Sequence, residues 1–170
     1  ALVAPMMEVL RNPQGAKWTA LFGADAGIDA MDLAAGFFYA RTFNGAPRYR
    51  VLRFDIMKPQ AAPVEVVPQQ AGVIDSVAAA RDGLYYTVRS GSIAELFFLP
   101  HGAAAGKAVR VNLPFAGGVS LLDNSATRDG VYFKLEGWTR PMRVMQARGA
   151  TATLTDLIPP DQSGTGTDWV

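Results

Sequence analysis

The sequence predicts an all-β protein built from repeated four-stranded antiparallel sheets, and three observations support this prediction. First, a glycine followed by an aromatic-rich segment recurs at Gly36, Gly83 and Gly130, each 47 residues after the last. Second, short apolar segments flank each of these glycines, and no long amphipathic helical pattern occurs. Third, proline and glycine are spread along the chain, as in proteins made of many short strands. Four short strands in each repeat of roughly 40–50 residues are typical of a β-propeller blade.

The aromatic segment is the second strand of each repeat. The turn before it contains Arg-Asp-Gly in two of the three repeats, at residues 81–83 and 128–130. We expect the glycine there because a tight turn needs a residue that tolerates positive φ. The other strands follow from apolar segments at matching places in each repeat. First strands are expected within 27–31, 72–77 and 118–122, third strands within 49–56, 93–99 and 142–147, and fourth strands within 64–67, 109–113 and 151–154.

These strands define a partial β-propeller of about three and a half blades over residues 1–158. Whole blades are expected at 27–68, 72–114 and 118–157. Residues 1–23 form half a blade, with strands at 6–10 and 18–21 joined by a turn at 11–15. Residues 159–170 are rich in Pro, Gly, Ser and Thr, which predicts a linker. A two-sheet sandwich of the same strands is the structural alternative.

Three and a half blades are too few to close a ring, because propellers have roughly four to eight. The end blades are therefore expected to expose apolar faces and unpaired strand edges. Either the 170 residues are a piece of a larger protein, or copies of the chain associate through these edges to complete a ring.

Composition excludes several classes of protein. The chain is 49% apolar and 18% charged, which is typical of a folded domain. A net charge of +1 gives no general attraction to nucleic acid or to a membrane surface, so neither is an expected partner. No apolar run reaches the length of about 18 residues that a membrane span needs. Cysteine is absent, which excludes disulfides and thiolate chemistry and leaves cytoplasm and periplasm both open.

Two segments carry a family resemblance. Residues 43–55, FNGAPRYRVLRFD, resemble the segment of prolyl oligopeptidase-type serine peptidases in which a proline turn leads into an Arg-containing strand that ends in Asp. Residues 130–141, GVYFKLEGWTRP, are similar to the last propeller blade of that family, in which an aromatic strand enters a proline turn. The resemblance covers nearly the whole chain and implies the C-terminal part of the family's propeller.

In that family the propeller precedes an α/β-hydrolase domain with a Ser-Asp-His triad. The resemblance implies that the intact protein cleaves short peptides, typically after proline, and that the propeller keeps folded proteins from the active site. No serine in this chain stands in the Gly-x-Ser-x-Gly pattern of such a nucleophile. We therefore expect no catalytic, cofactor-binding or metal-binding residue among the 170, and no cofactor.

Few side chains are candidates for chemistry. His101, the only histidine, follows Pro100 in a loop, so it is expected to be a solvated loop residue. Several aspartates could act as acid and base or bind a hard cation: Asp25, Asp29 and Asp32, which are close in sequence, and Asp75, which has a position like that of Asp29. We expect these residues to cap turns instead.

Arginines gather between residues 41 and 53, at Arg41, Arg48, Arg50 and Arg53. Such a cluster either meets a phosphate or a peptide carboxylate, or forms a solvated sheet face. Trp138 either packs against the turn at Pro141 or lines the inner channel. We select Arg41, Arg50 and Trp138 as candidate channel-facing or substrate-facing residues.

Three functional hypotheses follow. The leading one is a non-catalytic propeller segment of a serine peptidase, with the hydrolase domain and short peptide substrates as partners. The second is a stand-alone propeller-type protein-binding module, completed by self-association. The third is an enzyme acting inside the propeller, which needs converging carboxylates, whereas the sequence offers only scattered aspartates.

Overall fold

A computed structural model describes residues 2–3, 14–15 and 17–157, and these form an all-β structure of three four-stranded antiparallel sheets. Each sheet uses four consecutive strands in chain order. The first sheet contains β3 (Ile28–Ala34), β4 (Phe37–Thr42), β5 (Arg50–Asp55) and β6 (Val64–Val67). The second contains β7 (Val73–Ala79), β8 (Gly83–Ser90), β9 (Ile93–Pro100) and β10 (Val109–Arg110). The third contains β11 (Gly118–Asn124), β12 (Val131–Glu136), β13 (Arg143–Arg148) and β14 (Thr151–Leu154).

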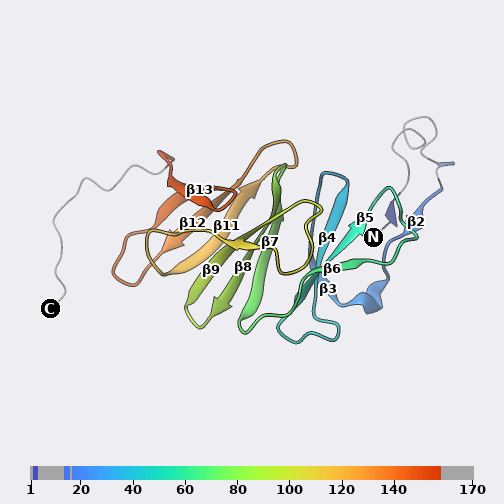
Figure 1. Cartoon of the computed structure of the whole chain (residues 1–170), viewed down its shortest axis with the longest axis horizontal. Helices are drawn as coiled ribbons and strands as arrows, with labels where there is room; N and C mark the ends of the chain where they lie inside the picture. Colours follow the sequence, from blue (N-terminus) through green and yellow to red (C-terminus); the bar gives the residue numbers. More distant parts are fainter. Residues whose placement is uncertain (1, 4–13, 16, 158–170) are drawn as a thin grey trace.

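The three sheets follow one another across the molecule like successive slices (Figure 1). Their first strands are neighbours, because β7 contacts both β3 and β11. Up-and-down sheets whose first strands converge in this way are blades of a propeller. The predicted fold class, a partial β-propeller with a 47-residue repeat, is therefore confirmed.

A short ribbon precedes the first sheet. β1 (Leu2–Val3) pairs antiparallel with β2 (Thr19–Ala20), and a 3-10 turn at Ala24–Ala26 leads into β3. β2 lies within the strand expected at 18–21. The strand expected at 6–10 lies outside the described residues, and so does the linker expected at 159–170.

The glycines that precede the second strand of each sheet are needed for two different reasons. Gly36 and Gly130 have φ of +76° and +80°, so the expected positive φ is confirmed for them. That expectation is wrong for Gly83, which has no positive φ. At Gly83, β8 passes so close to β9 that an added Cβ would lie 2.5 Å from the Leu99 carbonyl oxygen. Gly83 is therefore required by close backbone approach rather than by turn conformation.

The turn between β3 and β4 is strained at Ala35. Both residues of this two-residue turn, Ala35 and Gly36, have positive φ, and that of Ala35 is +51°. A non-glycine residue in the left-handed region costs about 1–2 kcal/mol. We expect Ala35→Gly to raise the free energy of unfolding by about 1 kcal/mol in urea titrations, despite the greater entropy of the unfolded chain. The control Ala104→Gly, in an exposed loop without positive φ, should be destabilising or neutral.

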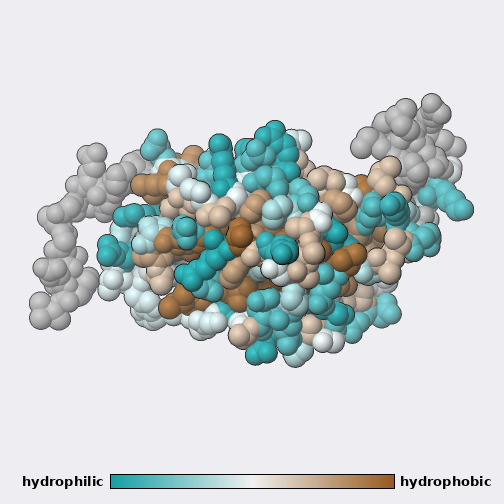
Figure 2. Space-filling model, in the orientation of Figure 1, coloured by the Kyte–Doolittle hydropathy of each residue, from teal (hydrophilic) through white to brown (hydrophobic). Residues whose placement is uncertain are grey.

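Two apolar cores lie in the seams between the sheets. The seam between the first and second sheets packs Tyr39, Val51, Ile74 and Leu84. The seam between the second and third packs Tyr85, Leu96, Phe133 and Leu135. The second sheet contributes to both seams, so six consecutive residues of β8, from Gly83 to Val88, are buried. Figure 2 shows that apolar residues form a broken band across this face of the molecule, with polar residues above and below it.

The outer face of the first sheet and the outer face of the third sheet differ in polarity. On the first sheet the outward side chains include Met31 and Leu33, which are 52% and 45% exposed, beside a cluster of Phe22, Phe38 and Phe54. This apolar face agrees with the expectation for an end blade. The outer face of the third sheet is more polar, because Phe133 and Leu135 point into the seam. Ser120, Lys134 and Gln146 are outward on this sheet, together with Val144, the partner of Lys134. Leu122 of the same sheet is nevertheless 54% exposed.

Candidate functional site

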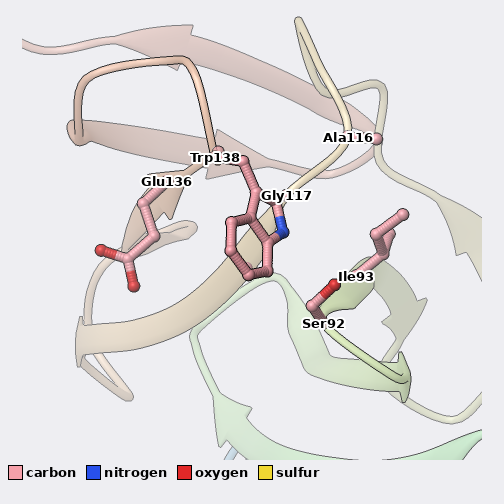
Figure 3. Close-up of a pocket in the computed structure, with 8 residues that line it drawn as sticks. Ser92, Ile93, Ala116, Gly117, Glu136 and Trp138 are labelled. Carbon is pink, nitrogen blue, oxygen red and sulfur yellow. The ribbon is translucent and has the colours of Figure 1, made fainter. Parts of the chain in front are cut away.

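The most exposed large hydrophobic residue among the described residues is Trp138, in the loop between β12 and β13. Its side chain is 92% exposed and borders a hollow of about 360 Å³ between the second and third sheets (Figure 3). Ser92 and Ile93 form the opposite side, at the start of β9. The expected alternative, that Trp138 packs into the turn at Pro141, does not fit a side chain so exposed.

Glycines form the floor of this hollow, which we call the Trp138 hollow. The β10–β11 connection enters β11 through Gly117 and Gly118, and an added Cβ on Gly117 would lie 2.1 Å from the Glu136 carbonyl oxygen. A side chain is excluded at Gly117 because the chain entering β11 passes too close to β12, its partner in the third sheet, whereas an added Cβ on Gly118 would make only an ordinary contact at 3.7 Å. Glu136 supplies the only charged side chain of the lining. In Figure 3 Glu136 and Ser92 lie on opposite sides of the indole of Trp138.

A second hollow of about 240 Å³ adjoins the first and shares Ile93 and Ala116 with it. Leu113 and Phe115 give it an apolar wall. The charged residues that line this second hollow are Arg110 and Glu95, which form an ion pair with a nitrogen–oxygen distance of 2.9 Å. Together the two hollows form a shallow groove across the seam between the second and third sheets.

Arg41 lies in the other seam, between the first and second sheets. Its guanidinium donates to both carboxylate oxygens of Asp29, at 2.9 and 2.8 Å, and to the carbonyl oxygens of Ile74 and Asp75. It also lies 4.4 Å from the ring centroid of Tyr49. Partial burial opposes ionisation of Asp29, but the hydrogen bonds and charge of Arg41 outweigh it and lower the pKa of Asp29 below its ordinary value.

Arg50 and Trp138 are not brought together with Arg41. Arg50, at the start of β5, forms an ion pair with Glu65 at 3.2 Å across the first sheet. Trp138 belongs to the third sheet's loop. The arginine cluster expected around residue 50 is therefore divided among several partners, and Arg53 lies over the ring of Phe37 at 4.8 Å.

The expectation of a solvated loop histidine at His101 is wrong. Its ring is half-buried in the seam between the first and second sheets, beside Phe37 and Tyr39. Nε2 lies 2.7 Å from the carbonyl oxygen of Ala80, to which it must donate. Nδ1 lies 2.7 Å from the Tyr39 hydroxyl and shares a hydrogen bond with it. With both nitrogens engaged in these contacts, His101 joins two blades.

A polar clasp, which sequence reasoning missed, links the first strands of all three sheets. Asp32 of β3 accepts hydrogen bonds from the Ala79 amide of β7, at 2.8 Å, and from the Asn124 side-chain amide of β11, at 2.6 Å. Asn124 also donates to the Ala79 carbonyl oxygen at 2.8 Å. The sequence drew attention to Asp32 through its neighbouring aspartates, but nothing singled out Asn124, which is 92 residues away.

Asp82 and Tyr85 form a similar link between the second and third sheets. The Tyr85 hydroxyl donates to Asp82 at 2.6 Å and accepts from the Gly149 amide at 2.7 Å, while Asp82 also accepts from the Gly130 amide at 2.9 Å. Burial, together with the bond to the Asp82 carboxylate, strongly raises the pKa of Tyr85. Burial also raises the pKa values of Tyr39 and Tyr86, each to about 12.

The raised pKa values of these tyrosines predict that the free energy of unfolding decreases at alkaline pH. A phenol with a folded pKa of about 12 and an unfolded value near 10 stabilises the fold fully below pH 10, and this contribution is lost as pH rises toward 12. Tyr86 should therefore contribute about 1.4 kcal/mol less at pH 11 than at pH 8. Urea titrations of Tyr86→Phe at both pH values should show a smaller decline than the parent chain. Tyr132→Phe, on the outer face of the third sheet, is the matched control, and an equal decline in all three proteins would contradict the expectation.

The aspartates do not converge on a metal. In the part of the chain that the structure describes, no three His, Asp or Glu side chains are grouped so that they could hold a metal ion. Asp29 and Asp75 pair instead with Arg41 and Arg89. Among the same residues, no helix is long and apolar enough to cross a membrane.

Comparison with known proteins identifies the architecture. The family model described as the N-terminal β-propeller domain of prolyl oligopeptidase matches residues 7–157. No curated protein matches the chain in sequence. Solved structures do match. One comes from a study of two prolyl endopeptidases and the role of inter-domain dynamics in catalysis and specificity, with 23% identity and a TM-score of 0.67, over 84% of this chain and 21% of that one.

Two further matches are structures of prolyl oligopeptidase B from Galerina marginata. The apo protein is 17% identical with a TM-score of 0.62, over 79% of this chain and 19% of that one. The form bound to a 35mer hydrolysis and macrocyclization substrate is 17% identical with a TM-score of 0.62, over 86% and 22%. The chain thus spans about a fifth of the length of these proteins, and at such identities the likeness shows the fold. Because the family model spans nearly all of its sequence, the chain belongs to the prolyl oligopeptidase N-terminal β-propeller domain family.

Proposed function

We propose that the chain is the non-catalytic propeller segment of a prolyl oligopeptidase-like serine peptidase. In this role it gates the access of short peptides to an α/β-hydrolase domain that lies outside these 170 residues. Family membership is the observation that carries the proposal. The absence of a Gly-x-Ser-x-Gly nucleophile and the engagement of His101 between two sheets also support it.

The proposed organisation keeps a half blade at 1–23, whole blades at 27–68, 72–114 and 118–157, and a linker at 159–170. We also propose that one end of the sheets faces the hydrolase domain. Both hollows open there, and the equivalent loops β4–β5 and β12–β13 expose Phe43 and Trp138 at the same end. Of the three candidate substrate-facing residues, Trp138 has the side chain most free to meet a peptide, while Arg41 and Arg50 are held in ion pairs.

The test uses the full product of the native reading frame. Its denatured mass should be several times that of this chain, and it should cleave short peptides after proline. A series of such peptides of increasing length measures gating. Arg41→Ala, which loosens the seam between two blades, should raise the cleavage of long peptides relative to short ones. Arg89→Ala, which removes a half-exposed ion pair with Asp75, is the control. A product of the mass of this chain alone, or one without peptidase activity, would contradict the proposal.

The alternative is a stand-alone binding module completed by self-association. The exposed Met31 and Leu33 on the outer face of the first sheet favour an apolar partner for that face. The more polar outer face of the third sheet is a poor complement to it, so head-to-tail closure by copies of the chain is disfavoured. Light scattering of the purified chain distinguishes the two functions: a stable closed oligomer supports the module, and a monomer excludes it.

A further inference from the structure

We propose that the Trp138 hollow binds the cationic side chain of an arginine or lysine in an extended peptide. This proposal rests on the proposed function in that the bound peptide is a substrate on its way to the hydrolase domain. It adds the class of side chain that the propeller recognises, and it assigns the recognition to Trp138 and Glu136.

The hollow has the shape and the apolar surface for a long side chain. Its volume of about 360 Å³ lies between the indole of Trp138 and the side chain of Ile93, which is 47% exposed. The glycine floor leaves the depth of the hollow free. An exposed indole and an aliphatic wall can cover the methylene stem of an arginine or lysine, which is apolar although its head is charged.

The charge of the lining decides the head group. Glu136 is the only charged lining residue, and its side chain is half exposed. One of its oxygens, Oε2, pairs with Lys134 at 3.3 Å, which is a weak exposed ion pair. A guanidinium in the hollow that reaches this carboxylate gains an ion pair, and one that lies over the indole face gains a cation–π interaction, for which Trp is the best ring.

Two nearby arginines do not line the hollow. Arg140 packs against the lining residue Gly137, where an added Cβ would lie 3.3 Å from the Arg140 Cβ. Arg143 lies over the ring of Phe115 at 5.8 Å, on the side of the second hollow. The second hollow presents Leu113 and Phe115, which suit an apolar side chain next to the cationic one. Since side chains two positions apart share one face of an extended peptide, the preferred peptide has an arginine and, two positions away, a leucine.

The experiment titrates the chain with the blocked peptide Ac-Ala-Arg-Ala-Leu-Ala-NH2 and its variants with citrulline or glutamate in place of arginine. Citrulline has the shape of arginine without its charge. Binding is followed by NMR of the indole N–H groups of Trp18, Trp138 and Trp169, and Trp138→Phe identifies the signal. We expect the arginine peptide to shift the Trp138 signal saturably, with a Kd on the order of 1 mM, because few side chains make contact. The citrulline peptide should bind at least fivefold more weakly.

Glu136→Gln should weaken binding of the arginine peptide about fivefold and leave citrulline binding unchanged. The matched control is Glu65→Gln, which removes a carboxylate of similar exposure that is paired with Arg50 in the first sheet. Equal binding of the arginine and citrulline peptides, or tighter binding of the glutamate peptide, would overturn the proposal, the latter in favour of Arg140 and Arg143. A failure here leaves peptidase activity of the full-length protein untouched, so the two proposals fail separately.

Discussion

Replacing Gly130 by alanine should lower the free energy of unfolding by about 3 kcal/mol or more. Gly130 has φ of +80°, which alone costs alanine about 1–2 kcal/mol. In addition, the new Cβ would lie 2.1 Å from the carbonyl oxygen of Ala147, so the β12–β13 pairing must shift. The amide of Gly130 is also held by Asp82 of the second sheet, so the disturbance should reach the seam. Urea unfolding followed by circular dichroism measures the change.

Gly102→Ala is the control that separates the two causes. Gly102 has a similar φ of +76°, but nothing lies within 4 Å of an added Cβ. This variant should therefore show only the conformational cost of about 1–2 kcal/mol. If both substitutions cost the same, the close approach at Gly130 contributes nothing, and the argument from backbone contact is wrong.

Asp32→Ala should cost about 2–4 kcal/mol, because it leaves two partly or fully buried donors without their acceptor. The amide of Ala79, a residue with 0% exposure, and the side-chain amide of Asn124 both depend on Asp32. Because the clasp joins three sheets, the variant should also broaden the unfolding transition, as the sheets become less strongly coupled. Urea titrations at pH 7 give both the midpoint and the slope.

A double-mutant cycle with Asn124→Ala tests the coupling directly. The two substitutions together should cost less than the sum of their separate effects by about 1 kcal/mol or more, since they remove one shared interaction. Asp55→Ala is the control, because Asp55 caps only its own local turn by accepting from the Met57 amide. Strict additivity of Asp32→Ala and Asn124→Ala would show that no clasp operates between them.

The fold could be predicted because its repeat is written into local sequence. Each blade places a glycine before its second strand, so Gly36, Gly83 and Gly130 recur at a 47-residue interval, although the physical reason differs among them. Apolar segments then mark the other strands, since each strand must fill a seam. The physical reason for each glycine could not be predicted from the sequence. Gly83 is required because the β9 backbone lies close to it, and the sequence contains no separate pattern that indicates such a close approach between strands.

The candidate site was only partly predictable. Trp138 was selected because a tryptophan beside the turn at Pro141 could line the inner channel. Ser92 and Glu136, which are 44 residues apart in the chain, line the same hollow only because two blades pack together. His101 was likewise expected to be a solvated loop residue, whereas its ring contacts Tyr39, which lies 62 residues earlier in the chain. Contacts between blades depend on packing in three dimensions, whereas the periodicity of a strand reports only which face is buried.

The position of the second sheet between two apolar seams sets an order of local opening. Either outer sheet can separate by breaking one seam, whereas the amide protons of β8 become accessible only after its neighbours move away on both sides. Because the apolar seams join each sheet only to its neighbours, and the first and third sheets are linked by the Asp32–Asn124 hydrogen bond, we expect the three to behave as a short linear array in which the ends fray before the middle. Backbone amide hydrogen exchange should therefore be fastest in the two outer sheets and slowest around Leu84 and Tyr86, so that the second sheet is the last part of the chain to open.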